Sequence, residues 1–224
     1  MSEYVNLVAE DGHDLKAYVA RPQGELVAGL VVVQEIFGVN AHIRSVADGY
    51  ARDGFLVVAP ALFDRIERDV ELGYTGADRQ RAMSFIPSLD PEKSLLDVAA
   101  AIEFVATATG KKVGVIGYCY GGTIAWLAAT RRGTPAVGYY GGHISNFAGE
   151  ALSAPVMLHF GKLDTHIPEA SIDTIRAAHP EVEIYSYDGA GHGFNRDVDA
   201  SYNSEAAHLA RERSLRFLKG NLAN

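Results

Sequence analysis

The chain has 224 residues, of which 48% are hydrophobic and 21% charged, and its formal net charge is −8. This length and balance predict one globular domain, residues 1–224, that is large enough to bury a substantial core. The acidic charge, with no cluster of Lys or Arg, argues against nucleic acid or an anionic membrane as the main partner.

The single cysteine, Cys119, excludes an internal disulfide and argues against a metal site built from thiolates. A lone thiol fits the reducing cytoplasm, and the N-terminus lacks the basic start and apolar core of a signal peptide. The longest apolar run, residues 26–33, is too short to cross a bilayer. We therefore predict a cytoplasmic location and no membrane contact.

The first third of the chain predicts a hairpin followed by alternating strands and helices. Residues 4–8 and 15–20 are expected to pair as antiparallel strands. The nearly continuous apolar run at 26–34 is typical of a strand covered on both faces. A helix over 42–52 and a strand over 55–59 follow. Asn40 stands just before this helix, where its side chain is placed to cap the helix N-terminus.

Residues 60–90 are the irregular part of the sequence. They are rich in charge and interrupted by Gly73 and Gly76, and a short helix is predicted around 77–85. An excursion of this length in a compact domain is usually a functional lid or wall. A long helix begins at Pro91, because proline is favoured in a first helical turn, and we expect it to run to about residue 108.

A glycine-rich turn, GYCYGG at residues 117–122, stands between a predicted buried strand at 112–116 and an apolar helix over 123–130. Strand, G-x-C-x-G and helix form the nucleophile-elbow pattern with cysteine in place of serine. The turn lifts one side chain above the sheet, and its glycines let backbone segments pass closely. A thiol at a helix N-terminus is favoured as thiolate. The plain alternative is a buried structural cysteine beside a glycine-rich packing contact.

The remaining sequence continues the alternation to the C-terminus. This order implies an α/β fold, with a mostly parallel central sheet and helices on both faces. The later elements are strands at 136–140, 155–160 and 182–187 and helices at 168–178 and 201–218.

Four side chains that could take part in catalysis directly follow predicted strands: Glu35, Cys119, Asp164 and His192. In such sheets, ligands bind beyond the carboxyl ends of the strands. Cysteine, acid and histidine occur in the chain order of the α/β-hydrolase triad. Their separations, 164 − 119 = 45 and 192 − 164 = 28 residues, leave room for strand–helix units between them. The set therefore predicts a catalytic triad.

Each member also has a plainer interpretation when it is taken alone. Asp164 could cap the following helix, and His192 could be a loop histidine with ordinary hydrogen bonds. We expect surface or packing roles for His143 and His166, although either could line the pocket. The other histidines lack a comparable setting: His13, His42, His159, His179 and His208.

Glu35 follows eight largely apolar residues, and a carboxylate there is costly to bury unless it is paired. The alternative is a solvated loop glutamate. No set of His, Asp and Glu has the spacing of a metal site, and neither G-x-G-x-x-G nor a Walker pattern is present. We therefore expect no metal and no cofactor.

Four segments together resemble the dienelactone hydrolase family over essentially the whole chain: QEIFGVN at 34–40, GYCYGG at 117–122, YYG at 139–141 and GHGF at 191–194. The resemblance implies an α/β-hydrolase fold and a triad of Cys119, Asp164 and His192. It also implies that Glu35 holds the resting thiol and helps to deprotonate it. The implied oxyanion hole consists of the N–H groups of Ile36 and Tyr120.

The resemblance further implies two arginines that bind the carboxylate of the substrate. Arg79 and Arg196 occupy the matching positions, with Arg81 close enough to compete with Arg79. The chain departs from the family at Gly193, where well-known members have a small hydroxyl residue. The excursion at 62–77 also resembles the family only loosely, and both departures bear on the substrate more than on the chemistry.

The activity implied by the resemblance is the opening of the lactone ring of dienelactone to give maleylacetate in the degradation of aromatic compounds. A carboxylesterase or thioesterase of the same fold is the nearest alternative. A ligand-binding or redox-sensing module that uses Cys119 is an alternative from another class. The sequence predicts a small-molecule ligand and leaves the oligomeric state open.

Overall fold

The computed structural model describes residues 2–223. The chain forms two compact units, one reaching to Gly114 and including the residues from Leu222, the other Val115–Asn221. That the whole chain is a single domain stays a prediction.

The first unit contains strands in the order β1-β2-β4-β3. Strands β1 (Ser2–Val8) and β2 (Asp14–Ala20) form the predicted antiparallel hairpin, and β2 pairs antiparallel with β4 (Phe55–Pro60). Strand β3 (Ala28–Val33) runs parallel to β4. Every residue of β3 and β4 is buried, as their continuous apolar sequence requires.

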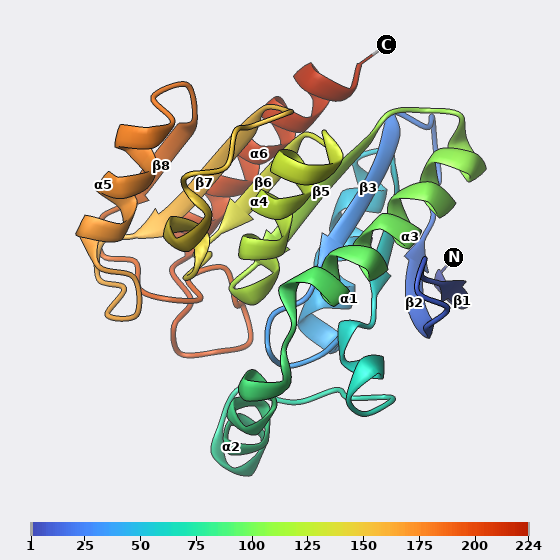
Figure 1. Ribbon diagram of the computed structural model, residues 1–224, viewed down its shortest axis with the longest axis horizontal. Helices are drawn as coiled ribbons and strands as arrows, with labels where there is room; N and C mark the ends of the chain where they lie inside the picture. The colour runs from blue at the N-terminus through green and yellow to red at the C-terminus, as the bar shows by residue number, and fades with distance from the viewer. Residues whose placement is uncertain (1, 224) are drawn as a thin grey trace. The chain divides into compact units, whose positions relative to one another are not determined.

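Helices α1 (Ala41–Arg52) and α3 (Pro91–Thr109) cover the strands of this unit. Figure 1 shows α3 in front of β3 and α1 behind it. The side chain of Asn40 accepts a hydrogen bond from the N–H of Ile43 and caps α1, which confirms the predicted cap. Asp90 caps α3 in the same way, through the N–H groups of the first turn.

The irregular segment after β4 contains the 3₁₀ turn η1 (Leu62–Arg65), the predicted short helix α2 (Gly76–Phe85) and the 3₁₀ turn η2 (Ile86–Ser88). Figure 1 shows α2 projecting at the bottom of the view. A cluster of apolar side chains, called here the segment cluster, anchors this segment to the loop after β3. Ile36 and Leu89 pack against its edge. Its buried members are Phe37, Phe63, Val70, Leu72, Tyr74, Ala82 and Phe85.

The second unit contains parallel strands in the order β5-β6-β7-β8. Helix α4 lies on the near side of these strands in Figure 1 and α6 on the far side. The strands are β5 (Val113–Tyr118), β6 (Ala136–Tyr139), β7 (Val156–Gly161) and β8 (Glu183–Tyr187). The helices are α4 (Tyr120–Arg132), the 3₁₀ turn η3 (Ile144–Phe147), α5 (Glu169–Ala178) and α6 (Ser204–Leu222).

The alternation of strands and helices expected from the sequence is confirmed in both units. Helix α4 begins at Tyr120, directly after the cysteine, rather than at residue 123. Helix α6 runs to Leu222, beyond the expected end at 218, and the 3₁₀ turns were not predicted. Within residues 2–223, no helix combines the length and apolar character that a membrane span needs.

Candidate active site

The backbone at Cys119 makes the sharp turn that the elbow pattern predicts. β5 ends at Tyr118, α4 starts at Tyr120, and Cys119 between them has φ 54° and ψ −115°. Such a conformation is strained for a residue with a side chain and persists where the surroundings enforce it. Here the N–H of Cys119 donates to the carbonyl of Tyr139 at 2.9 Å, so the turn is tied to the end of β6.

Gly117 makes the tight return of the chain possible. A Cβ atom at this position would lie 1.8 Å from the carbonyl oxygen of Gly121, a distance that no side chain tolerates. The expected close approach of backbone around the cysteine is therefore present. It leaves the thiol partly exposed at the start of α4.

The second unit brings Cys119, His192 and Asp164 together. The Nε2 atom of His192 lies 3.2 Å from the sulfur of Cys119. Its Nδ1 atom donates to Oδ2 of Asp164 at 2.8 Å. One imidazole thus contacts the thiol with one nitrogen and a carboxylate with the other, the geometry needed for a histidine that moves a proton to and from a nucleophile.

Asp164 is held rigidly in the loop between β7 and α5. Its side chain is fully buried, and Oδ1 accepts hydrogen bonds from the N–H groups of His166 and Ile167 at 2.8 and 3.3 Å. The N-cap residue of α5 is Pro168, and no side chain caps this helix with a hydrogen bond. The interpretation of Asp164 as a helix cap is therefore wrong. One oxygen fixes the loop, and the other is left to orient His192.

The electrostatics of His192 favour its protonated form. Burial by itself lowers the pKa of this imidazole, but its hydrogen bonds to Asp164 and Cys119 and the negative charge beside it raise the pKa to about 10. A protonated His192 carries its positive charge directly beside the sulfur of Cys119.

Aromatic rings surround His192. The ring of Tyr140 lies 5.1 Å from the imidazole and that of His166 lies 5.2 Å away. Tyr140 has φ 38°, a second strained residue in this unit, and its side chain is fully buried. The tyrosine motif at 139–141 pointed to this region. The alternative that His166 lines the pocket agrees with its ring contact to His192.

Glu35 lies in the first unit, directly after β3, and is completely buried. The hydroxyl of Tyr74 donates a hydrogen bond to its Oε2 atom at 3.0 Å. The interpretation of Glu35 as a solvated loop residue is therefore wrong. Sequence analysis missed Tyr74, because only the folding of the irregular segment brings it to a residue 39 positions away.

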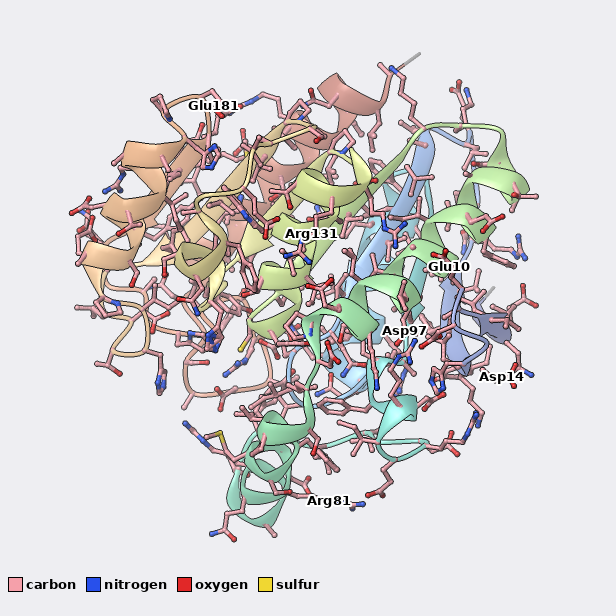
Figure 2. The ribbon with its side chains drawn as sticks, viewed as in Figure 1. Glu10, Asp14, Arg81, Asp97, Arg131 and Glu181 are labelled. Atoms are coloured by element: carbon pink, nitrogen blue, oxygen red, sulfur yellow. The ribbon has the colours of Figure 1, made fainter. Side chains whose placement is uncertain are left out.

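The remaining predicted site residues have distinct settings. In the first unit, Ile36 packs against the segment cluster. In the second unit, Tyr120 is the first residue of α4. Arg79 and Arg81 are both exposed on α2. Arg81 forms an ion pair with Glu67, and Figure 2 shows its side chain beside α2 at the bottom of the view.

Arg196, in the loop after His192, is buried, unlike the two arginines of α2. Its guanidinium lies 5.9 Å from the centre of the Tyr140 ring and 3.9 Å from the carboxylate of Asp199. Across residues 2–223, no group of three or more His, Cys, Asp and Glu side chains is arranged to hold a metal ion.

Comparison with known proteins identifies the family. A model of the dienelactone hydrolase family matches residues 15–222. Carboxymethylenebutenolidases from Pseudomonas putida and Pseudomonas knackmussii are each 32% identical, covering 97% of this chain and 96% of theirs.

Solved structures agree with that match. A candidate dienelactone hydrolase from Klebsiella pneumoniae aligns with a TM-score of 0.85 and 28% identity, covering 97% of this chain and 98% of its own. A dienelactone hydrolase-like promiscuous phosphotriesterase from metagenomic libraries, 20% identical, has a TM-score of 0.78 and coverage of 100% and 99%. The expected α/β-hydrolase fold is thus confirmed, and the chain is a hydrolase that belongs to the dienelactone hydrolase family.

Proposed function

We propose that this hydrolase uses Cys119 as its nucleophile and opens the lactone ring of dienelactone to give maleylacetate. The observation that carries the proposal is the contact of one imidazole, His192, with the thiol at 3.2 Å and with Asp164 at 2.8 Å. The family and its carboxymethylenebutenolidase members support the substrate.

In the proposed reaction, the thiolate of Cys119 attacks the lactone carbonyl and forms a carbon–sulfur bond. The ring carbon–oxygen bond then breaks, and the leaving oxygen departs as an enolate, which takes up a proton and becomes the ketone. Water, activated by His192, hydrolyses the thioester and restores the thiol. An enolate is a good leaving group, so this chemistry suits activated esters better than amides.

The family resemblance assigns the supporting roles. The N–H groups of Ile36 and Tyr120 would stabilise the oxyanion, which is usually the largest single contribution to catalysis. Glu35 would hold the resting thiol and assist its deprotonation when substrate arrives. Its complete burial supports a specific role, because a carboxylate is rarely withdrawn from water without one.

Arg79 and Arg196 would bind the carboxylate of the substrate. On a chain of net charge −8, an anionic substrate needs local positive charge. Arg81 is already paired with Glu67, whereas Arg79 has no ion pair within the described residues. This difference supports Arg79 over Arg81.

The decisive measurement compares kcat/KM for dienelactone with kcat/KM for simple 4-nitrophenyl esters. We expect dienelactone to be the better substrate. Turnover of nitrophenyl esters without turnover of dienelactone would make the protein a general carboxylesterase of the same fold. Oxidation of Cys119 by peroxide with no hydrolysis of either would favour a redox-sensing role.

A further inference from the structure

His159, on β7, is a completely buried histidine outside the candidate triad. Its Nδ1 atom lies 2.9 Å from the hydroxyl of Tyr187 at the end of β8. Its Nε2 atom lies 3.0 Å from the hydroxyl of Ser214 on α6. The hydroxyl of Tyr139, at the end of β6, lies 2.8 Å from the same serine oxygen. These four side chains, called here the core network, therefore link three strands to one helix.

The proton positions in the core network follow from one acceptor at its inner end. The carbonyl of Ala210 can only accept, so the Ser214 hydroxyl donates its single proton to that carbonyl, at 2.8 Å. The serine oxygen must then accept from the Tyr139 hydroxyl and from the Nε2–H group of His159. The Nδ1 atom of His159 is therefore the acceptor for the Tyr187 hydroxyl. This is the one arrangement in which every donor meets an acceptor.

His159 is neutral in this arrangement. Burial and the positive charge of Arg213 lower its pKa from 6.5 to about 3. The guanidinium of Arg213 donates to the Tyr187 oxygen at 3.1 Å and lies over the ring of Tyr185 at 4.0 Å. The outer end of the core network is thus closed by a held cation, and its charge does not change near neutral pH. Such a network holds positions rather than moving protons.

The core network supports the turn that carries Cys119. The carbonyl of Tyr139 accepts the N–H of Cys119 at 2.9 Å, and its ring lies 4.7 Å from that of Tyr118. Because Cys119 has a strained backbone with φ 54°, its position depends on the partners that enforce it. The side chain of one such partner, Tyr139, is fixed in turn by Ser214.

The same network supports the surroundings of His192. The carbonyl of His159 accepts the N–H of Tyr140 at 2.7 Å, and the ring of Tyr140 lies 5.1 Å from the imidazole of His192. Phe194, two residues after His192, packs against the ring of Tyr187, with 5.3 Å between the ring centres. Both sides of the sulfur–imidazole contact therefore rest on one buried set of hydrogen bonds.

We propose that Ser214 is a positioning residue for the reaction: ordered by His159, its hydroxyl holds Tyr139 and so sets the distance between the sulfur of Cys119 and Nε2 of His192. The inference rests on the proposed function, in which these two atoms carry the chemistry. Ser214 is completely buried, so it acts through Tyr139 and not on the substrate. Its loss should therefore lower kcat and leave KM nearly unchanged.

Ser214→Ala removes the hydroxyl and leaves a residue with high helix propensity in α6. We expect kcat for dienelactone to fall about 10- to 100-fold, as a small misplacement of reacting groups predicts. KM should stay close to the wild-type value. A wild-type kcat, or a loss confined to KM, would overturn the proposal.

Ser153→Ala is the matched control in the same unit. The hydroxyl of Ser153 also donates to a backbone carbonyl, that of Thr130 at 2.9 Å, in a hydrogen bond outside the core network. We expect both serine variants to unfold at lower urea concentration than the wild type, but only Ser214→Ala to lose kcat. An equal loss of kcat in Ser153→Ala would contradict the proposal, because reduced stability alone would then explain it.

A double-mutant cycle tests whether the effect passes through Tyr139. Tyr139→Phe keeps the ring and removes only the hydroxyl, so we expect the same fall in kcat as in Ser214→Ala. The combined variant should lose no more than either single variant, because both remove the same hydrogen bond. Additive losses would show that the two residues act independently and would refute the proposed link.

A titration of His192 separates this inference from the proposed function. Burial lowers the pKa of His192, whereas its hydrogen bonds to Asp164 and Cys119 raise it to about 10. A greater distance to the sulfur should therefore lower the midpoint, and we expect NMR to show this in Ser214→Ala and not in Ser153→Ala. The measurement needs no substrate, so it holds even if the protein hydrolyses a different ester. An unchanged midpoint in Ser214→Ala would overturn the inference and leave the hydrolase proposal standing.

Discussion

The Nε2 atom of His192 lies 3.2 Å from the Sγ atom of Cys119, although 73 positions separate the two residues in the sequence. The strained turn at Cys119 and the loop after β8 have to be formed together for this contact to exist. Because Asp164 holds the opposite nitrogen of the ring, the imidazole is fixed in one orientation. Three consequences of this arrangement, one of the proposed role of Arg79 and one of the setting of Glu35 can be tested directly.

Replacement of Cys119 by alanine should abolish hydrolysis, with a fall in kcat of more than about 10³-fold, as expected when a nucleophile is removed. Steady-state kinetics with dienelactone measures the loss. Intact-protein mass spectrometry of a rapidly quenched wild-type reaction should show an acyl adduct, located at Cys119 by peptide mapping. Full activity in the alanine variant would disprove the proposed chemistry.

Asp164→Asn should lower kcat by about 10²- to 10⁴-fold, because an amide cannot hold the imidazole in the same tautomer or stabilise its charge. The fold should survive, since the amide oxygen can still accept the N–H groups of His166 and Ile167. Thermal unfolding checks this point. Activity close to wild type would mean that Asp164 only shapes the loop.

The charge on His192 should persist well above neutral pH. Its pKa is raised from 6.5 to about 10, so the folded protein keeps a proton that the unfolded chain releases. The contribution of His192 to the free energy of unfolding is therefore complete below pH 6.5 and is lost as the pH rises through about 10. An NMR titration of the imidazole measures this directly. In Cys119→Ala, the midpoint should fall, because one hydrogen bond that raises it is gone.

Arg79→Ala should lower kcat/KM for dienelactone about 10- to 100-fold, since a charged hydrogen bond contributes about 1.5–3 kcal/mol and each decade corresponds to about 1.4 kcal/mol. The methyl ester of dienelactone should be nearly unaffected. Arg81→Ala is the matched control on the same helix, because its guanidinium pairs with Glu67. If Arg81→Ala shows the selective loss and Arg79→Ala does not, the assignment is reversed.

Glu35→Gln should leave the fold intact and slow acylation in single-turnover kinetics, while Tyr74→Phe tests the hydrogen bond that Glu35 receives. The phenylalanine ring can keep the contact with Phe37, at 4.6 Å between ring centres. Removing only the hydroxyl should lower the free energy of unfolding by about 1–3 kcal/mol, measured by urea denaturation. An acylation rate and thiol titration in Glu35→Gln that match wild type would remove Glu35 from the mechanism.

The sequence by itself determined the strands and helices and the order of the candidate catalytic residues along the chain. Apolar runs, the Asn40 cap and the turn around Cys119 are local signals, because the residues that carry them are neighbours in the chain. Strand ends gather at one edge of a parallel sheet, so the grouping of Cys119, Asp164 and His192 followed from that order.

The tertiary structure alone decided which polar groups meet. Tyr74 reaches Glu35, Glu67 pairs with Arg81 rather than Arg79, and Arg196 lies over Gly193. Contacts of this kind depend on the path of the irregular segment and on the rotamers that packing selects, and no periodic pattern encodes them. The candidate catalytic residues could therefore be predicted from the sequence, whereas the side chains that surround and orient them were decided only by tertiary packing.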